Sequence, residues 1–334
     1  MLKKLPSIAL FFTLAGAIVL MGCAGAGNDP GDAGGGGGND YTSPNIGTLK
    51  YVPAGSFQRD AHSTNVSVIS VPFRMSRHEI TRQQFFDIMG GDPSDPSSSS
   101  DSTITSGSTN ITDPVQRVNW YQAIAFCNKL SIAEGLTPVY SANAGGSEVD
   151  WANLTVAEIP YGVINDADWD AVVCDWSADG YRLPTEMERM WAAMGADQDA
   201  RDAAMQGGVN LSGYDKDFAG YDGSNSIDAY VWHGGNTDPD GDQANTTQAV
   251  GTKNENELGL HDLSGNIIEW CWDRHVSDYP DGELIDYRGG GASSGVDRVV
   301  AGGSWRHEAQ YCNVSFRGFS SPGETDNNYG FRVL

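Results

Sequence analysis

The stretch LGLHDLSGNIIEWCWD, residues 258–273, carries the densest group of motifs in this chain of 334 residues. Its second half, residues 265–270, reads GNIIEW. Two shorter blocks follow toward the C-terminus, GGSW at residues 302–305 and GFR at residues 330–332. Together with blocks nearer the N-terminus, these motifs decide the fold.

Regular structure is predicted at several places upstream of this stretch. Residues 50–57 read as a strand broken by a turn, and residues 66–73 have the β-branched content of a second strand. A helix is expected from Thr81 to the glycines after residue 89, because Thr81 is a suitable N-cap and apolar residues follow at helical spacing. A second helix is expected over residues 120–134. Thr185, with a glutamate three residues later, forms a capping box that starts a third.

Long irregular segments separate these elements. Residues 92–112 are rich in Ser, Asp, Pro and Thr, which predicts a solvated low-complexity loop. Residues 201–256 are rich in Gly, Asp and Asn, which predicts further long loops. Nine tryptophans and thirteen tyrosines nevertheless favour a substantial core.

The N-terminus has the pattern of an exported lipoprotein. Two lysines and a short apolar run predict a secretory signal over residues 1–22, and that run is too short to span a membrane. The tetrad Leu-Met-Gly-Cys ending at Cys23 resembles a lipobox, which implies lipidation of Cys23 and attachment to the bacterial outer membrane, on the cell surface. Residues 23–43 contain a run of five glycines and read as a flexible tether. The folded domain is expected over residues 44–334.

The charge of the chain excludes one class of partner. There are 44 acidic residues and 20 basic residues, which gives a net charge of −24. Nucleic acid is therefore not an expected partner, because its phosphates require concentrated Lys and Arg. Four further cysteines, at positions 127, 174, 271 and 312, form no Cys-x-x-Cys pair, so they are expected to be structural or free.

Eight blocks in order resemble the formylglycine-generating-enzyme (sulfatase-modifying factor) family. They are YVPAGSF at 51–57, HEIT at 78–81, PV at 114–115 leading to Trp120, YRLPTE at 181–186, GL at 259–260, GNIIEW at 265–270, GGSW at 302–305 and GFR at 330–332. The resemblance implies an α+β domain of the C-type lectin fold, with short antiparallel strands, two main helices and much loop.

The resemblance also bears on catalysis. The family's oxidase uses two cysteine thiolates near the GGSW block to hold copper, since soft thiolates select Cu(I). The second position corresponds to Cys312, whereas the first is His307. A chain without the first cysteine is expected to be non-catalytic and to require no cofactor.

Calcium is a separate expectation from the same resemblance. The family's ligands correspond here to the side chains of Asp262 and Glu269 and to the carbonyls of Gly265 and Ile267, all hard oxygens. The alternative is that Glu269 only caps the loop through hydrogen bonds. Aspartates at positions 238, 240 and 242 imitate the start of an EF-hand loop, but the later ligand positions do not fit, so this segment reads as an acidic turn.

Residues 302–334 show a further resemblance, to the variable proteins of diversity-generating retroelements. In that family, asparagine codons of a template are scrambled by adenine mutagenesis, and mixed aromatic and small polar residues suit an adaptable binding surface. Between scaffold residues lie side chains that such mutagenesis can reach, and these are the expected ligand-binding residues: Arg306, His307, Tyr311, Asn313, Ser315, Phe316, Gly318, Phe319, Ser320, Ser321, Gly323, Thr325, Asp326 and Asn327.

Three functions remain open from the sequence. The favoured one is a surface-displayed lipoprotein, acting as a monomer, with a diversified site for an extracellular protein or carbohydrate. The second is an oxidase related to formylglycine-generating enzyme, against which His307 argues. The third is a structural envelope lipoprotein without a specific ligand.

Overall fold

Helix α2, Trp120–Ala133, lies at the centre of the main hydrophobic core. Its N-cap Asn119 and Gln122 form a reciprocal capping box, which satisfies two backbone N–H groups at the helix start. The indole N–H of Trp120 donates to the carbonyl of Cys271 at 2.9 Å, and the indole N–H of Trp270 donates to the carbonyl of Val118 at 2.8 Å. The GNIIEW stretch is therefore fixed to the start of α2.

This computed structural model describes residues 38–94, 112–201, 204–237 and 246–334. The predicted signal peptide, Cys23, most of the tether at 23–43, nearly all of the loop at 92–112 and the acidic turn at 238–242 lie outside the described residues. The end of the tether lies inside, and there the expectation was wrong. Tyr41–Ser43 is strand β1, paired with Gly47–Val52, β2. The folded domain thus begins a few residues before position 44.

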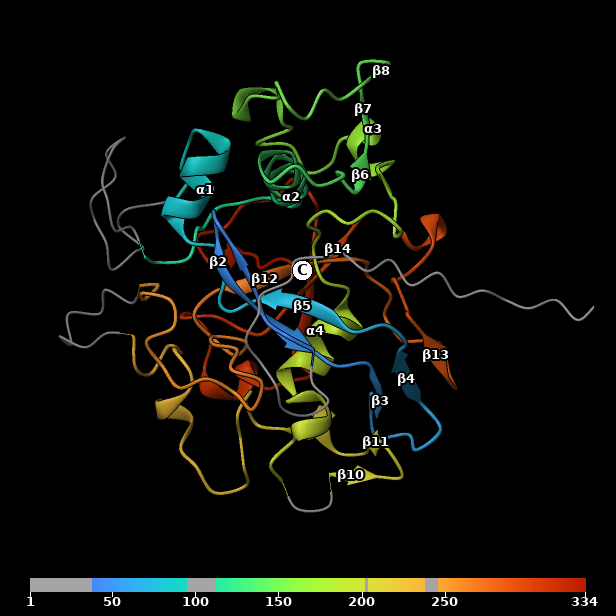
Figure 1. Cartoon of the computed structure of the whole chain (residues 1–334), viewed down its shortest axis with the longest axis vertical. Helices are drawn as coiled ribbons and strands as arrows, with labels where there is room; N and C mark the ends of the chain where they lie inside the picture. The colour runs from blue at the N-terminus through green and yellow to red at the C-terminus, as the bar shows by residue number, and fades with distance from the viewer. Residues whose placement is uncertain (1–37, 95–111, 202–203, 238–245) are drawn as a thin grey trace, which may run out of the picture. The chain divides into compact units, whose positions relative to one another are not determined.

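Two further helices begin where an N-cap residue, Thr81, and a capping box, at Thr185, predict them. Helix α1, Arg82–Met89, is capped by Thr81, and helix α4, Glu186–Ala193, is capped by Thr185. Figure 1 shows α1 beside α2, with α4 in the opposite half of the domain. One-turn helix α3 is Ala167–Asp170. Two main helices were expected. Among the described residues, three helices have a length of at least eight residues, because α1 and α4 are equally long and α2 is longer. Short 3-10 helices are Val156–Glu158, Ala196–Gln198, Gly213–Asp215, Ile227–Ala229, Ala292–Ser294 and Ala309–Cys312.

The described strands are short and form five small sheets. A three-stranded sheet has the order β1-β2-β5, and a five-stranded sheet has the order β10-β11-β3-β4-β13. Two-stranded ribbons pair β6 with β9 and β7 with β8. The bounds are β3 Gly55–Gln58, β4 Val66–Ile69, β5 Phe73–Ser76, β6 Tyr140–Ser141, β7 Asn143–Ala144, β8 Ser147–Glu148, β9 Val173–Cys174, β10 Met205–Gln206, β11 Val209–Asn210 and β13 Leu284–Ile285.

The four-stranded sheet carries the C-terminal segment. Its order is β15-β14-β12-β16, with β12 Ile268–Arg274, β14 Arg298–Ala301, β15 Arg317–Ser320 and β16 Tyr329–Gly330. Strand β14 pairs antiparallel with both β12 and β15, whereas β16 pairs parallel with β12. The strands are therefore not all antiparallel as expected: β3 with β11 and β4 with β13 are parallel as well.

A buried carboxylate joins this sheet to the rest of the domain. Glu269 on β12 accepts from Arg189 of α4 at 2.7 Å and from Arg332 at 2.8 Å, and all three side chains are almost completely buried. The two arginines hold the pKa of Glu269 below its usual value despite burial, which by itself raises it. The hydrophobic cluster around α4 is thereby connected to the main core around α2.

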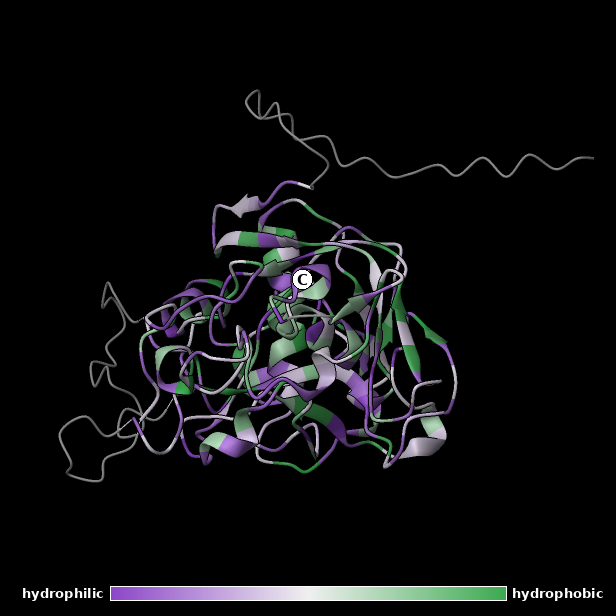
Figure 2. Ribbon diagram, turned by 90° about the horizontal axis from the view of Figure 1, so that it is seen from below, coloured by the Kyte–Doolittle hydropathy of each residue, from purple (hydrophilic) through white to green (hydrophobic). Residues whose placement is uncertain are grey.

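Hydrophobic and polar residues are finely mixed along the chain. Figure 2 shows short green and purple stretches alternating along strands and loops. Across the described ranges no helix combines the length and the hydrophobicity that crossing a membrane requires. Cys127, Cys174, Cys271 and Cys312 are all buried and free.

Candidate functional site

The C-terminal segment separates into a buried scaffold and an outward-facing set of side chains. The scaffold residues that the structure buries are Trp305, Cys312, Val314, Pro322, Gly330, Phe331 and Arg332. Strand β15 and the loops on either side of it carry the remaining residues to the surface. This separation is what a binding surface on a fixed frame requires.

The fourteen expected ligand-binding residues divide by exposure. Arg306, Tyr311 and Phe319 are exposed; His307, Asn313, Ser315, Phe316, Gly318, Ser321, Thr325, Asp326 and Asn327 are half-buried; Ser320 and Gly323 are buried. We call the first twelve the C-terminal surface. Glu308, Gln310 and Glu324, which the codon argument excludes, are also exposed.

Ser320 and Gly323 do not belong to this surface, and here the sequence expectation was wrong. The hydroxyl of Ser320 donates to Glu324 at 2.8 Å, and Ser320 is only 5% exposed. The N–H of Gly323 donates to the carbonyl of Ile164 at 3.0 Å, and a Cβ on Gly323 would lie 2.0 Å from the carbonyl oxygen of Val163. Position 323 therefore has no room for a side chain. At Gly318, by contrast, the nearest atom to an added Cβ is 3.4 Å away.

One aromatic cluster forms at the start of the C-terminal surface. The ring of His307 lies 5.4 Å from that of Phe316 and 6.2 Å from that of Tyr311, and Phe316 and Tyr311 are 6.0 Å apart. Ser304 and the Nδ1 of His307 share a hydrogen bond of 2.8 Å. Burial, and then the neighbouring Arg306, lower the pKa of His307, so its ring is neutral at pH 7. The cluster offers aromatic faces without charge.

A second aromatic feature lies on β15. Phe319 is 56% exposed, and its ring stacks on His275 at 4.3 Å. Burial, and then Arg317, lower the pKa of His275, so this pair is also uncharged at pH 7. His275 was not predicted, because it lies far from the C-terminal segment in sequence and carries no local signal.

Polar side chains complete the surface. Arg306 donates to Asp326 at 2.7 Å and to the side chain of Asn327 at 3.0 Å, and its guanidinium lies 5.7 Å from the ring of Trp305. The ion pair is exposed, so it contributes little to stability and is free to exchange partners when a ligand binds. The surface thus combines aromatic area with adaptable hydrogen-bonding groups.

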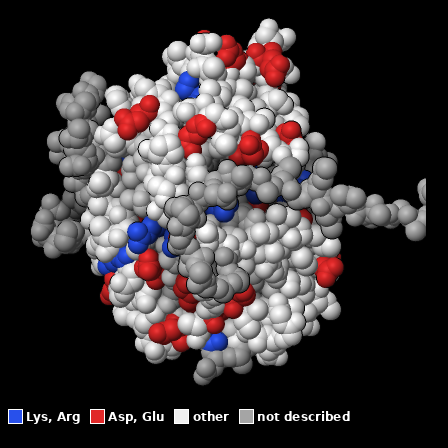
Figure 3. Space-filling view, in the orientation of Figure 1, with Lys and Arg blue, Asp and Glu red and all other residues white. Residues whose placement is uncertain are grey.

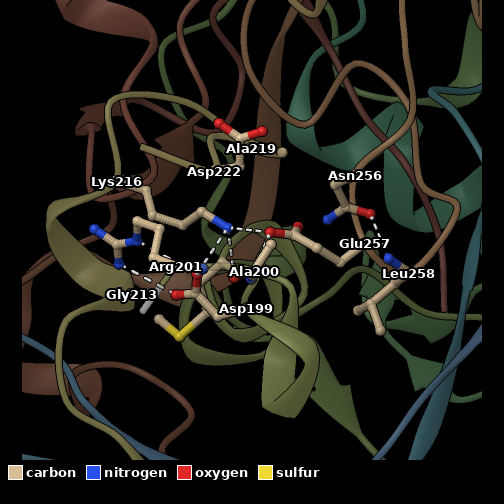
Figure 4. A network of polar contacts seen from close by, with 12 residues as sticks. Asp199, Ala200, Arg201, Gly213, Lys216, Ala219, Asp222, Asn256, Glu257 and Leu258 are labelled. Carbon is tan, nitrogen blue, oxygen red and sulfur yellow. Dashed lines mark hydrogen bonds and ion pairs between the residues drawn. The ribbon is translucent and has the colours of Figure 1, made fainter. Parts of the chain in front are cut away.

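A buried ionic network around Lys216 joins Asp199 and Glu257 (Figure 4). The ammonium of Lys216 donates to Glu257 at 2.5 Å and to the carbonyl of Met194 at the end of α4 at 3.0 Å, and it lies 3.3 Å from Asp199. The backbone N–H of Val314 donates to the carbonyl of Lys216 at 3.2 Å. This hydrogen bond links Val314, between Tyr311 and Phe316, to the residue at the centre of the ionic network.

Of the two carboxylates expected to bind calcium, Glu269 is fully engaged and Asp262 is engaged through one oxygen. Both oxygens of Glu269 accept from arginines, as described above. Asp262 accepts from the backbone N–H of Gly251 at 2.7 Å, and its other oxygen has no partner in the described structure. The described ranges contain no group of three or more His, Cys, Asp or Glu residues placed to hold a metal. Calcium binding through Gly265, Ile267 and these carboxylates stays a prediction that the arginines disfavour.

The positions that correspond to the copper ligands are also unsuited to thiolate chemistry. Cys312 is completely buried and packs with Phe218 and Val231, and burial raises the pKa of its thiol to about 12. The thiol is therefore protonated at neutral pH, although metal binding requires the thiolate.

Comparison with known proteins identifies the family. A family model described as Sulfatase-modifying factor enzyme 1-like domain matches residues 41–334. The chain belongs to this family. Its fold is that of the formylglycine-generating enzymes, mixed α and β with short strands and many loops, as the sequence predicts.

Three similar proteins have different names and are covered to different extents. The solved structure of Treponema denticola variable protein 1 is 35% identical, with a TM-score of 0.71 over 88% of this chain and 97% of that one. Chaperone protein LppX of Paenibacillus barcinonensis is 28% identical over 298 residues, 86% of this chain and 88% of LppX. The formylglycine-generating enzyme of Thermomonospora curvata is 30% identical over 206 residues, which is 57% of that enzyme. The chain thus spans most of the first two proteins and less than two thirds of the third.

Proposed function

We propose that this chain is a non-catalytic surface lipoprotein that binds an extracellular ligand through its C-terminal surface, and that retroelement mutagenesis diversifies this surface. One observation carries the proposal: of the fourteen positions that the sequence assigns to adenine mutagenesis of asparagine codons, twelve are exposed or half-buried, while Trp305, Cys312, Val314 and Phe331 of the scaffold are buried. The similarity to Treponema denticola variable protein 1 supports it over nearly the whole of that chain.

The proposed lack of catalysis follows from the chemistry of Cys312 and His307. A buried thiol with a raised pKa does not supply a thiolate for Cu(I), and the Nδ1 of His307 is engaged by Ser304. A copper titration followed by absorbance tests this. We expect no thiolate-to-copper absorbance from the wild-type chain and no change on Cys312→Ser. A stoichiometric absorbance signal that Cys312→Ser abolishes would favour the oxidase hypothesis instead.

Location at the outer membrane rests on the N-terminal sequence. Lipidation of Cys23 would tether the domain through the glycine-rich segment, and acylation supplies the membrane affinity that no described helix provides. Metabolic labelling with an alkyne-bearing fatty acid tests the anchor. The wild-type chain should be labelled, and a Cys23→Ser chain should not be.

A second candidate function is that of a chaperone, which the similarity to LppX over 88% of its length favours. The two functions differ in their dependence on the C-terminal surface. A chaperone recognises exposed apolar segments of many clients, whereas a diversified receptor recognises the ligand that suits one variant. Suppression of aggregation of a denatured test protein, measured by light scattering, distinguishes them when the wild-type chain is compared with Tyr311→Ser and Phe319→Ser.

Sequencing of the locus from many cells tests the proposed diversification directly. We expect substitutions at Arg306, Tyr311 and Phe319, with Trp305 and Cys312 constant. A near-identical template with asparagine codons at the variable positions should lie nearby. An invariant segment without such a template would refute the diversified receptor.

A further inference from the structure

A loop beside the C-terminal surface displays an unusual apolar tip. Tyr161, Val163 and Ile164 are 48%, 44% and 71% exposed, three large apolar side chains within four residues. No charged residue lies between them. Exposed apolar groups that cluster in this way mark interaction sites more often than isolated ones do.

The tip is held in place rather than loosely attached. At one end the side-chain amide of Asn119 donates to the carbonyl of Pro160 at 2.7 Å, and at the other the backbone N–H of Asp166 donates to the hydroxyl of Tyr121 at 2.8 Å. Both anchors belong to the start of α2, the rigid centre of the core. The apolar side chains are therefore presented on a fixed support.

This tip contacts the C-terminal segment at Gly323, between Ser321 and Thr325 of the C-terminal surface. Gly323 donates its N–H to the carbonyl of Ile164, and the lack of a side chain at position 323 lets the two backbones touch. The carbonyl of the next scaffold residue, Pro322, accepts from the N–H of Trp120 at 2.9 Å. A ligand that contacts the segment on either side of Gly323 therefore meets Ile164 as well.

An acidic cleft lies on the other side of the tip. It has a volume of about 330 Å³, and Tyr161 and Val163 line it together with Glu158, Asp166 and Asp168. No lysine or arginine lines it. Hydrogen bonds from the N–H and hydroxyl of Thr155 lower the pKa of Glu158, so its carboxylate is ionised at neutral pH. Figure 3 shows acidic side chains gathered on the part of the surface where Figure 1 places β7, β8 and α3, the elements around this cleft.

From this geometry we infer that the 161–164 tip and the acidic cleft beside it form an unvarying second half of the binding site, and that this half receives a protein segment with aliphatic and cationic side chains. The inference rests on the proposed function of the C-terminal surface and adds the class of its ligand. Val163 and Ile164 favour protein over carbohydrate, because branched aliphatic groups offer sugars neither a flat stacking face nor hydrogen bonds. The carboxylates favour Lys or Arg in the same segment.

Peptide selection with depletion tests this inference. A random 12-residue phage library is selected on the full chain and depleted on a chain carrying Tyr311→Ser and Phe319→Ser, so that the retained peptides depend on the C-terminal surface. We expect them to be enriched in aliphatic residues and in Lys or Arg. Their affinity should fall about 10-fold on Ile164→Ser, the loss typical of one well-buried aliphatic contact.

The matched control is Val71→Ser, which removes an equally exposed apolar side chain, 67% against 71%, beyond strand β4. It should change the affinity by less than about twofold. Ile164 and Val71 are both exposed, so neither substitution should alter the thermal unfolding of the chain. Asp168→Asn keeps an acceptor for the N–H of Gly145 and removes only the charge, so it should weaken peptides that contain Lys or Arg and spare the others.

The outcomes separate the two proposals. Retained peptides that bind Ile164→Ser as tightly as wild type would overturn the second half of the site and leave the C-terminal surface intact. If no peptide survives depletion, the C-terminal surface does not select peptide segments and the inferred ligand class is overturned, whereas the proposed diversified receptor is tested separately by sequencing of the locus.

Discussion

Two glycines of the C-terminal segment should respond in opposite ways to the same substitution. Gly318→Asn and Gly323→Asn each install the residue that the proposed template would encode. At position 318 the new Cβ meets Val300 at 3.4 Å, an ordinary contact, whereas at position 323 it would lie 2.0 Å from the carbonyl oxygen of Val163. The backbone must move at 323, and the hydrogen bond to Ile164 is lost.

The expected magnitudes follow from these contacts. Overpacking plus a lost hydrogen bond should cost Gly323→Asn about 2–4 kcal/mol in the free energy of unfolding. Gly318→Asn should stay within about 0.5 kcal/mol of wild type, as surface substitutions usually do. Urea unfolding followed by tryptophan fluorescence should therefore show a midpoint lower by about 1 M for the first variant and unchanged for the second.

The result that would refute this reasoning is equal stability of the two variants. If Gly323→Asn unfolds at the same urea concentration as Gly318→Asn, the loop at Val163 yields to a side chain at no cost, and position 323 belongs to the variable set after all. Sequences from a population give an independent test, because a position closed to side chains should remain glycine even if its template codon is mutated.

Three further predictions concern the buried charges. Glu79 is fully buried, and neither of its carboxylate oxygens has a hydrogen-bond partner among the described residues; burial, then Asp262, raise its pKa well above the usual value. The contribution of Glu79 to stability is therefore largest below the unfolded pKa of about 4.5 and is lost as the pH rises through the folded pKa, so Glu79→Gln should reduce the loss of stability between pH 5 and pH 8 in urea unfolding. Lys216→Met leaves Glu257 without its cation, so it should cost about 3–5 kcal/mol in urea unfolding, part of which Glu257→Gln in the same chain restores. Exchange of calcium for EDTA should leave the thermal midpoint unchanged, because arginines occupy both oxygens of Glu269; a clear fall in EDTA would show that calcium displaces them.

Local sequence patterns predicted the elements whose cause is local. The predicted N-cap at Thr81 and the predicted capping box at Thr185 depend on residues at most three positions away, and the structure confirms both helix starts. The family blocks predicted the fold because their order is specific. Strand β1 was missed because Tyr41–Ser43 follows a glycine run and is fixed by distant contacts, the pairing with β2 and hydrogen bonds from Tyr41 and Ser43 to Glu134.

The parts of the site that the sequence could not predict depend on distant contacts. Phe319 stacks on His275, and Lys216 lies between Asp199 and Glu257; neither arrangement has a spacing rule. The failure at Gly323 has the same origin. A codon argument identifies which residues can change, but only the distance to Val163 shows which of them have room to do so.

If the C-terminal surface varies while the scaffold stays constant, substitutions in the surface must have little effect on the free energy of unfolding. If each of the twelve outward-facing positions alters stability by up to about 0.5 kcal/mol in either direction, random changes at all of them combine to roughly 2 kcal/mol, within the margin of about 5–15 kcal/mol of a folded domain. One change at Gly323 would cost as much as the whole set. The exclusion of position 323 from the surface is therefore what allows the remaining positions to vary together, and the same close approach holds Ile164, which lies outside the C-terminal segment, against Gly323.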